Sequence, residues 1–416
     1  MNYKEEKLAD YIDILSGYAF KTKDFTDKGI PIIKIKNICP PYVSLDDLSF
    51  VSKETAALQK KFELTYDDVL IAMTGSHINQ WASVVGRVAR VKYNQKTLLN
   101  QRVGKITVKD NNKANIDYIY YFLSQDSIKI ELAAKAGGAA NQANISPTQI
   151  KDLCFPCPEI SKQNKIASIL RSYDDLIENN QKQIKLLEEA AQRLYKEWFV
   201  DMHFPGWENT KSVDGVPEGW RKAHLSDIIE KITTGLNPRK NFVLGQGNNY
   251  YVTIKNMGNN TIYLDDKCDR ITDDALEKIN KRSDLRIGDL LFSGIGTMGR
   301  VYLVSIPTNN WNVSESVFTM RANNTVSKEY LYMLLLSSDM QHYCDCNAHG
   351  AAQRGIRMAD LKAYPFILPK SEILTNFTAI ISPFIEKTQA LQKQITKLNE
   401  ARDRLLPKLM SGELEV

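Results

Sequence analysis

The chain of 416 residues is poor in cysteine and in long apolar runs. Its six cysteines are scattered and form no disulfide framework, which is typical of a protein in a reducing compartment. No run approaches the ~18–20 apolar residues that a membrane span needs, and the charged opening MNYKEEKLADY is unlike a secretory signal peptide. We therefore expect a cytoplasmic protein. The formal net charge of +5 permits a polyanionic partner without requiring one.

Patterns that would carry catalysis are scarce as well. The five histidines fit no Ser/His/Asp arrangement, and no pair of carboxylates stands out, so a hydrolytic site is not expected. No Pro-Asp pair occurs, which leaves a PD…ExK nuclease core without support. Pro40-Pro41-Tyr42 is similar to the end of the Asn/Asp-Pro-Pro-Tyr/Phe loop of amino-methyltransferases. Cys39, however, stands where that chemistry needs an amide or a carboxylate.

Two groups of cysteine and histidine have spacings that resemble those of metal sites: Cys154 with Cys157, and His342 with Cys344, Cys346 and His349. Neither group recurs in the other half of the chain. We therefore favour thiols without a metal over a structural zinc ion.

What the sequence does contain is a long internal repeat. Residues 181–195 and 392–406 are identical at nine of fifteen positions, beginning with QKQI in both. Weaker matches upstream keep their order: IKN at 35–37 and 254–256, LDD at 45–47 and 264–266, GRV at 86–88 and 299–301, and GAA at 138–140 and 350–352. The offset slides from 219 to 211, as expected when insertions collect in loops. The chain is one unit used twice, and each unit is a variable region followed by a helical one.

Both helical regions carry apolar residues in alternating steps of four and three. The first set is Ile166, Leu170, Tyr173, Ile177, Asn180, Ile184, Leu187, Ala191, Leu194 and Trp198, and the second is Phe377, Ile381, Phe384, Thr388, Leu391, Ile395, Leu398, Arg402, Leu405 and Leu409. This spacing predicts two helices of roughly 50 Å that pack on each other as a coiled coil. Two amphipathic helices in an ordinary core remain the alternative. Pro383, preceded by Ser382, predicts that the second long helix opens there after a short lead-in.

The variable regions have the pattern of mixed α/β domains. Short β-branched or aromatic runs predict strands at 30–38, 69–73, 250–257 and 301–306. Helices are predicted at 116–135 and 327–346, each before a patch of small residues. Residues 205–220, PGWENTKSVDGVPEGW, form a linker between the units.

Gly294, Gly296 and Gly299 have the G-x-G-x-x-G spacing of a dinucleotide-binding turn. The corresponding stretch of the first unit, 73–86, is eight residues longer and has no glycine at its start. The sequence after Gly299 reads as a strand that ends before Pro307, whereas a pyrophosphate site needs a helix N-terminus there. We therefore predict strand, loop, strand.

Several loops of both units combine lysine or arginine with amide and hydroxyl side chains at matching positions. Cations neutralise phosphates, while Arg can contact guanine and Asn or Gln can contact adenine with two hydrogen bonds. The predicted DNA-binding residues are Lys34, Lys36, Asn37, Thr74, Ser76, Asn79, Gln80, Arg87, Gln101, Arg102, Asn141, Gln142, Asn144, Arg239, Lys240, Lys255, Asn256, Thr297, Arg300, Gln353, Arg354 and Arg357. Replacing Arg300 with alanine is expected to weaken one half of a DNA site and to spare the other.

The whole chain resembles the DNA-specificity subunit of type I restriction–modification systems. The resemblance is strongest at RLYKEWFVD (193–201), FPG (204–206), PEGW (217–220) and the tail RLLPKLMSGEL (404–414). LAD (8–10) with SG (16–17), and LSD (225–227) with TG (234–235), match the way in which the family begins each target-recognition domain.

The resemblance implies an α+β architecture: two target-recognition domains separated by a long antiparallel two-helix coiled coil. The expected division is domain 1 at 1–157, a central conserved helical region at 158–204, domain 2 at 205–369 with its opening linker at 205–220, and a C-terminal conserved helical region at 370–416. The seam of the coiled coil would include Ile177, Ile184, Leu187, Leu194, Leu391, Ile395, Leu398 and Leu405.

The resemblance also implies that each domain binds one half of a bipartite, asymmetric DNA sequence, while the helices fix the spacer and dock two methyltransferase subunits. Motor-nuclease subunits would join in the full complex. The chain itself would be non-catalytic and without a cofactor or metal. S-adenosylmethionine, ATP and Mg²⁺ would belong to the partners, and the methyltransferase would flip the adenine out of the duplex.

Two other functions remain as alternatives. A stand-alone methyltransferase that uses GIGTMG would bind S-adenosylmethionine without any partner. A coiled-coil adaptor would show no salt-sensitive duplex binding even in complex with a methyltransferase.

Overall fold

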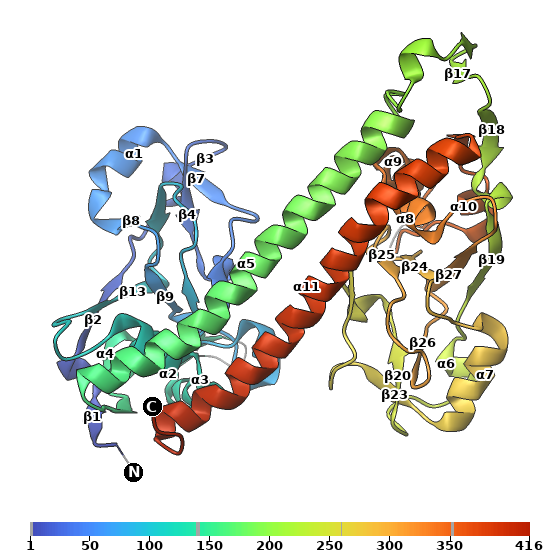
Figure 1. The fold of residues 1–416 in the computed structure, drawn as a ribbon. Helices are drawn as coiled ribbons and strands as arrows, with labels where there is room; N and C mark the ends of the chain where they lie inside the picture. The colour runs from blue at the N-terminus through green and yellow to red at the C-terminus, as the bar shows by residue number, and fades with distance from the viewer. Residues whose placement is uncertain (1–2, 139–141, 259, 351–352) are drawn as a thin grey trace. The chain divides into compact units, whose positions relative to one another are not determined.

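The protein is represented by a computed structural model that describes residues 3–138, 142–258, 260–350 and 353–416. Its internal contacts divide the chain into two compact units (Figure 1). The first lobe is Met1–Ile177 with Lys397–Val416, and the second lobe is Glu178–Thr396. Each of the two long helices therefore contributes one segment to each lobe. Within the described residues, no helix is both long and apolar enough to cross a bilayer.

The first lobe is built on two sheets. One has the order β2-β13-β9-β11-β6-β5 and the other the order β3-β7-β4-β12-β8. The strands are β2 (Ile12–Ser16), β3 (Phe25–Thr26), β4 (Ile30–Ile33), β5 (Ile38–Cys39), β6 (Tyr42–Val43), β7 (Ser49–Val51), β8 (Glu63–Leu64), β9 (Val69–Ala72), β11 (Val88–Arg90), β12 (Thr97–Leu99) and β13 (Val103–Val108). The helices are α1 (Lys53–Leu58), α2 (Ile116–Ser124), α3 (Asp126–Lys135) and α4 (Pro147–Lys151). Two further strand pairs are β1 (Glu5–Lys7) with β15 (Cys154–Pro156), and β10 (Thr74–Gly75) with β14 (Ala143–Asn144).

The second lobe repeats the central part of this topology, with four strands in one sheet and three in the other. The order β19-β27-β24-β25 corresponds to β2-β13-β9-β11, and β23-β20-β26 corresponds to β7-β4-β12. The strands are β18 (Arg221–His224), β19 (Ile229–Thr234), β20 (Asn249–Val252), β21 (Met257–Gly258), β22 (Thr261–Ile262), β23 (Asp269–Ile271), β24 (Leu290–Ser293), β25 (Val301–Leu303), β26 (Trp311–Val313), β27 (Val317–Ala322) and β28 (Pro365–Leu368). The helices are α6 (Pro238–Asn241), α7 (Asp273–Ser283), α8 (Lys328–Leu336), α9 (Ser338–Cys346) and α10 (Met358–Lys362). The mixed α+β fold with two related lobes, predicted from the repeat, is confirmed.

The central strand of each main sheet is almost entirely apolar, VLIA in β9 and LLFS in β24, because both of its faces are buried. In β9, Val69 and Ile71 belong to one hydrophobic cluster and Leu70 and Ala72 to another. Successive side chains of a strand point to opposite faces, so this alternation places one core on each side of the sheet. The twin strand β24 divides Leu290 and Leu291 between two clusters in the same way.

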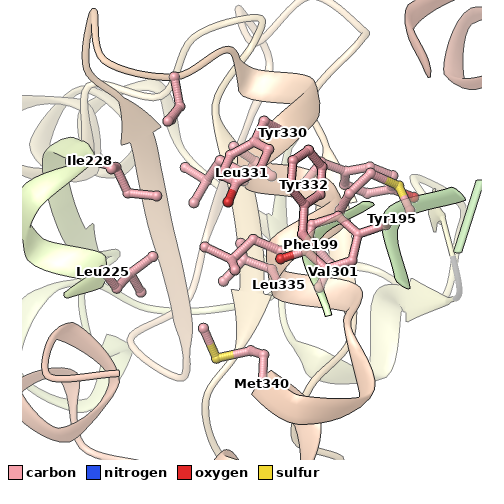
Figure 2. Packing of buried hydrophobic residues seen from close by; sticks show 14 of the residues in the cluster. Tyr195, Phe199, Leu225, Ile228, Val301, Tyr330, Leu331, Tyr332, Leu335 and Met340 are labelled. Atoms are coloured by element: carbon pink, nitrogen blue, oxygen red, sulfur yellow. The ribbon is translucent and has the colours of Figure 1, made fainter. Parts of the chain in front are cut away.

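The core of the second lobe is rich in aromatic side chains (Figure 2). Tyr195 and Phe199 of α5 (Ile160–Phe199) pack with Tyr330 of α8 and with Phe377 of α11 (Ser371–Ser411). The ring centroids of Phe199 and Phe377 are 4.7 Å apart, and those of Phe199 and Tyr330 are 5.2 Å apart. Trp198 adds a further ring 5.8 Å from Phe377. This cluster joins the two long helices to the domain that lies between them in the chain.

Within each lobe the segments of α5 and α11 run antiparallel. In the first lobe, Ile166 and Leu170 near the start of α5 share a cluster with Leu409 and Met410 near the end of α11. In the second lobe the late part of α5 packs on the early part of α11. Of the predicted seam, Ile177, Leu391 and Ile395 are buried, and Ile184, Leu187, Leu194, Leu398 and Leu405 are half-buried.

Four sets of sequence predictions of local structure are wrong. Helix α11 begins at Ser371, so Pro383 lies inside it rather than at its start. Its ring is exposed. The predicted helices 116–135 and 327–346 are each broken in two, because Gln125 and Ser337 adopt extended backbone. The predicted strands 30–38 and 250–257 are each interrupted by a 3₁₀ turn, Ile35–Asn37 and Ile254–Asn256. The strand predicted at 301–306 is shorter, ending at Leu303.

Candidate nucleic-acid interface

Three loops of the first lobe converge on Met73, at the end of β9. The Met73 amide donates to the Arg102 carbonyl at 2.9 Å, and the Ile145 amide donates to the Met73 carbonyl at 3.0 Å. The Thr74 hydroxyl donates to Oδ1 of Asn144 at 2.7 Å. We call residues 74–84, 100–102 and 142–145 the first loop cluster.

The second lobe brings together the same three loops around Gly294, at the end of β24. The Gly294 amide donates to the Ser316 carbonyl at 3.1 Å, and its carbonyl accepts from the Ile356 amide at 2.9 Å. The Gly296 amide donates to the Arg354 carbonyl at 2.8 Å. We call residues 294–300, 314–316 and 353–357 the second loop cluster. Both clusters occupy the same place in the fold.

The glycines of G-x-G-x-x-G serve backbone packing here. The stretch lies between the antiparallel strands β24 and β25, in which Leu290 pairs with Leu303, so the predicted strand–loop–strand arrangement is confirmed. A Cβ at Gly294 would lie 2.8 Å from the Phe318 ring, and one at Gly299 would lie 1.9 Å from Oε1 of Gln341. Gly299 also has a φ of +87°. No helix follows this loop, so it lacks the N-terminal amides that hold a pyrophosphate.

The predicted DNA-binding residues fall into three groups by exposure. The exposed ones are Lys36, Asn79, Gln80, Gln101, Arg102, Gln142, Arg239, Lys240, Lys255, Thr297, Gln353, Arg354 and Arg357. Lys34, Arg87, Asn144 and Arg300 are half-buried, and Asn37, Thr74, Ser76 and Asn256 are buried. Asn141 lies outside the described residues. The loop clusters gather nine of the exposed residues, while Lys36, Lys255, Arg239 and Lys240 lie outside them.

The buried residues hold turns together and do not present their polar atoms to a ligand. Oδ1 of Asn37 accepts from the Lys34 amide at 3.1 Å, and Oδ1 of Asn256 accepts from the Thr253 amide at 3.0 Å. In the first loop cluster the Ser76 hydroxyl donates to the Gln80 carbonyl at 2.6 Å, and Thr74 is bonded to Asn144 as described above. In this structure none of these four side chains is placed to contact a base.

Arg87 and Arg300 have the same structural contact in the two lobes. Nη2 of Arg87 donates to the Ile35 carbonyl at 3.3 Å, and Nη1 of Arg300 donates to the Ile254 carbonyl at 3.2 Å and also to that of Met257. Each guanidinium therefore ties the loop cluster to the IKN turn. The repeat indicates this structural role, because GRV occurs in both units and residues that both units share maintain the common fold.

Lysine and arginine side chains around the clusters also have partners within the chain. Nζ of Lys34 donates to the Ser49 hydroxyl at 2.8 Å, and burial lowers the pKa of this amine. Lys36 pairs with Asp47. Nη2 of Arg354 donates to the Asp345 carbonyl at 2.7 Å.

Sequence reasoning missed two residues of the first loop cluster and one beside the second. His349 bridges Arg357 and Asp360, with Nε2 3.0 Å from Oδ2 of Asp360. Ile78 and Trp81 are exposed in the first loop cluster. The sequence prediction took only polar residues from that loop, although Trp81 stands beside the amides of Asn79 and Gln80 in the sequence.

The cysteine and histidine groups are spread over different environments. Cys154 and Cys346 are exposed and Cys157 is half-buried. Sγ of Cys346 lies 3.5 Å from Nε2 of His342. Over the parts of the chain that the structure describes, no three His, Cys, Asp or Glu side chains are grouped to hold a metal ion.

Comparison with known proteins places this architecture in a family. The family described as type I restriction modification DNA specificity domain matches residues 1–189 and 217–400. The MjaIX specificity subunit of a type I restriction enzyme from Methanocaldococcus jannaschii is 28% identical over 307 residues, which are 72% of this chain and 69% of that protein. The putative MjaX specificity subunit of the same organism is 24% identical, in an alignment that covers 100% of this chain and 94% of that protein.

One solved structure shows the same fold. It is the S subunit of a type I restriction-modification system from M. genitalium, which aligns with a TM-score of 0.60 and 16% identity. The alignment covers 99% of this chain and 96% of that one. Because the family match spans both lobes, the chain belongs to the type I restriction modification DNA specificity family.

Proposed function

We propose that this chain is the DNA-specificity subunit of a type I restriction–modification complex, and that each lobe recognises one half of a bipartite site. The observation that carries the proposal is the pair of loop clusters. Two homologous domains present the same three loops at the same place, but different exposed side chains within them. Amide side chains dominate the first cluster and arginines the second. A shared scaffold with different exposed side chains is what reading two different half-sites requires.

We further propose the division of labour that the sequence suggested. Residues 1–157 and 205–369 are the target-recognition domains, and 158–204 and 370–416 form an antiparallel coiled coil that sets the spacer. The chain does no chemistry itself. Methyltransferase subunits bind it and supply adenine methylation, and motor-nuclease subunits complete the assembly. The support is the seam, whose residues are buried or half-buried along both helices.

The contacting residues are proposed to be the exposed members of the two clusters. They are Asn79, Gln80, Gln101, Arg102 and Gln142 in the first lobe, and Thr297, Gln353, Arg354 and Arg357 in the second. Lys36, Lys255, Arg239 and Lys240, which lie outside the clusters, suit phosphate contacts. A bidentate contact to the correct base contributes ~1–3 kcal/mol of discrimination, or roughly 5- to 150-fold in affinity.

The test uses the complex of this chain with its methyltransferase subunits. Methylated adenines are mapped in modified DNA, and duplex affinity is measured over a series of salt concentrations. Arg102→Ala should relax or weaken one half-site and Arg354→Ala the other. Arg221→Ala, an exposed arginine of the second lobe outside its loop cluster, is the matched control and should leave both half-sites unchanged. Equal damage to both half-sites from either cluster variant would contradict the modular assignment.

A stand-alone methyltransferase is tested with the same material. The chain by itself should not bind S-adenosylmethionine at micromolar concentration. Binding under those conditions would overturn the non-catalytic assignment.

A further inference from the structure

The loop between β10 and β11 differs from its twin in length and in what it exposes. Residues 73–86 are eight residues longer than the corresponding 294–299. The extra length forms the 3₁₀ segment Ile78–Ser83. Two large apolar side chains stand in solvent there: Ile78 is 56% exposed and Trp81 is 38% exposed. Exposed apolar groups at a functional surface are typical of contact sites.

The polar groups of this loop hold it together from within. The Ser76 hydroxyl donates to the Gln80 carbonyl at 2.6 Å. Its oxygen lies 3.0 Å from the hydroxyl oxygen of Ser83. Nη1 of Arg87 donates to the Ala82 carbonyl at 2.9 Å. None of these bonds uses the side chain of Ile78 or Trp81. The loop therefore has internal supports, and the exposed parts of Ile78 and Trp81 are accessible to a partner.

The surroundings of the two side chains suit a nucleic acid. The amides of Asn79 and Gln80 are exposed between them, and Arg102 is exposed in a neighbouring loop of the same cluster. Nζ of Lys129 lies 5.0 Å from the centre of the Trp81 ring and pairs with Asp126 at 2.6 Å, so it supports the ring from within the chain. Apolar groups among amide and cationic side chains match a surface that stacks on bases while contacting groove edges and phosphates.

The second loop cluster is built differently. Its short loop exposes Ile295 and Thr297, and its third loop exposes Arg354 and Arg357. No aromatic side chain is found in the described part of residues 294–300, 314–316 and 353–357. The two lobes therefore offer different chemistry to the two halves of a site.

We infer that Ile78 and Trp81 form an apolar wedge that presses against the bases of the first half-site in duplex DNA. This inference rests on the proposed function. An inserted apolar side chain partly unstacks a base step, and pyrimidine–purine steps unstack most easily. The first lobe thus selects its half-site partly by the deformability of such a step, and the second lobe relies on its arginines.

The experiment uses the complete complex with the methyltransferase subunits and a duplex that carries the mapped site. Trp81→Ala should weaken binding roughly tenfold or more, as expected for removal of a stacking aromatic side chain. The dependence of affinity on salt should keep its slope, because an apolar contact displaces no counterion. Trp81→Phe should retain most of the affinity, and Ile78→Ala should weaken binding in the same direction.

The controls separate this inference from the proposed function. Trp207→Ala removes an exposed tryptophan far from the loop in sequence and should have no effect on binding. The mapped first half-site should contain a pyrimidine–purine step, and replacing that step should cost the wild-type complex more affinity than it costs the Trp81→Ala complex. The wedge would be overturned if both Trp81→Ala and Ile78→Ala kept wild-type affinity. A changed salt slope, or a loss of methyltransferase assembly instead of DNA binding, would also overturn it. Failure of the wild-type complex to bind DNA selectively would overturn the proposed function.

Discussion

Arg87 and Arg300 make equivalent hydrogen bonds in the two lobes. Each guanidinium donates to a main-chain carbonyl of the IKN turn, Ile35 in one lobe and Ile254 in the other. A buried carbonyl that loses its donor pays its full desolvation cost. These arginines therefore act on the loop clusters through the position of the backbone, although their charge and spacing in the sequence suggested contact with DNA.

Replacement of either arginine is expected to loosen its own lobe. Arg300→Ala should lower the free energy of unfolding of the second lobe by about 1–3 kcal/mol, because it leaves carbonyls of the IKN turn without their donor. Hydrogen–deuterium exchange should rise in peptides covering 254–258 and stay unchanged in peptides covering 35–39. Arg87→Ala should give the opposite pattern, so each variant is the control for the other. DNA affinity lost without any local increase in exchange would show that Arg300 contacts DNA directly.

The long helices are anchored to the two lobes by different chemistry. In the second lobe the anchor is aromatic and centres on Phe377. In the first lobe ion pairs add to the apolar cluster: Arg402 of α11 pairs with Asp174 of α5 at 2.7 Å, and Arg171 of α5 pairs with Asp117 at the start of α2 at 2.8 Å. Arg171 also pairs with Asp67, at 2.5 Å, in the turn before β9. The first anchor should therefore be the more sensitive to pH.

The pKa of Asp67 determines in which direction pH changes the stability of the first lobe. Burial opposes ionisation of this carboxyl, but the hydrogen bond from Arg171 and the charges of Arg90 and Lys92 outweigh it, so its pKa is lowered on folding. A carboxyl of this kind stabilises the fold above its unfolded-state pKa of ~3.9. That stability is lost as pH falls through the lower folded-state pKa.

Asp67→Asn should therefore destabilise the first lobe at pH 7, while the variant should lose less stability than the wild type on acidification below about pH 5. Unfolding by denaturant at pH values from 3 to 7 measures both effects. Asp27→Asn, an exposed carboxyl of the same lobe, is the control. Parallel pH profiles for the wild type and Asp67→Asn would contradict the assignment.

At the scale of elements, the sequence predicted what depends on periodicity and missed what depends on single residues. The seam positions of α5 and α11 are buried or half-buried as the steps of four and three predicted. The breaks at Gln125 and Ser337 were missed because helix-compatible residues flank them on both sides. In the second case the Ser337 hydroxyl caps α9 by accepting from the Met340 amide at 3.3 Å. Pro383 was misplaced because a proline on an exposed helix face removes one hydrogen bond without disturbing the buried face.

At the scale of the whole molecule, the repeat predicted two related lobes but not their loops. Shared motifs such as IKN lie in equivalent turns, since both lobes need the same backbone there. The eight-residue insertion that carries Ile78 and Trp81 has no twin, so no internal comparison could predict its structure. The proposed recognition surface is the part of each lobe in which the copies diverged, which explains why the site was harder to predict than the fold.

The proposed spacer role of the helices predicts how the recognised site responds to their length. Seven residues with the seam pattern would be inserted into α5 between Ile177 and Glu178 and into α11 between Thr396 and Lys397, where both helices pass from one lobe to the other. At ~1.5 Å per residue the pair lengthens by roughly 10 Å, or about 3 base pairs of B-DNA. Mapping of methylated adenines should show a spacer longer by about that amount between unchanged half-sites.

Affinity for the lengthened site should be lower than for the original one, because three extra base pairs also turn the second half-site by roughly 100° about the DNA axis. The matched control is a seven-residue insertion between Asp214 and Gly215, in the turn joining β16 (Ser212–Val213) to β17 (Val216–Pro217), outside both helices. It lengthens the chain equally and should leave the spacer unchanged. If the helix insertion also left the spacer unchanged in a folded, DNA-binding complex, the distance between half-sites would have to be set by the methyltransferase subunits and not by α5 and α11.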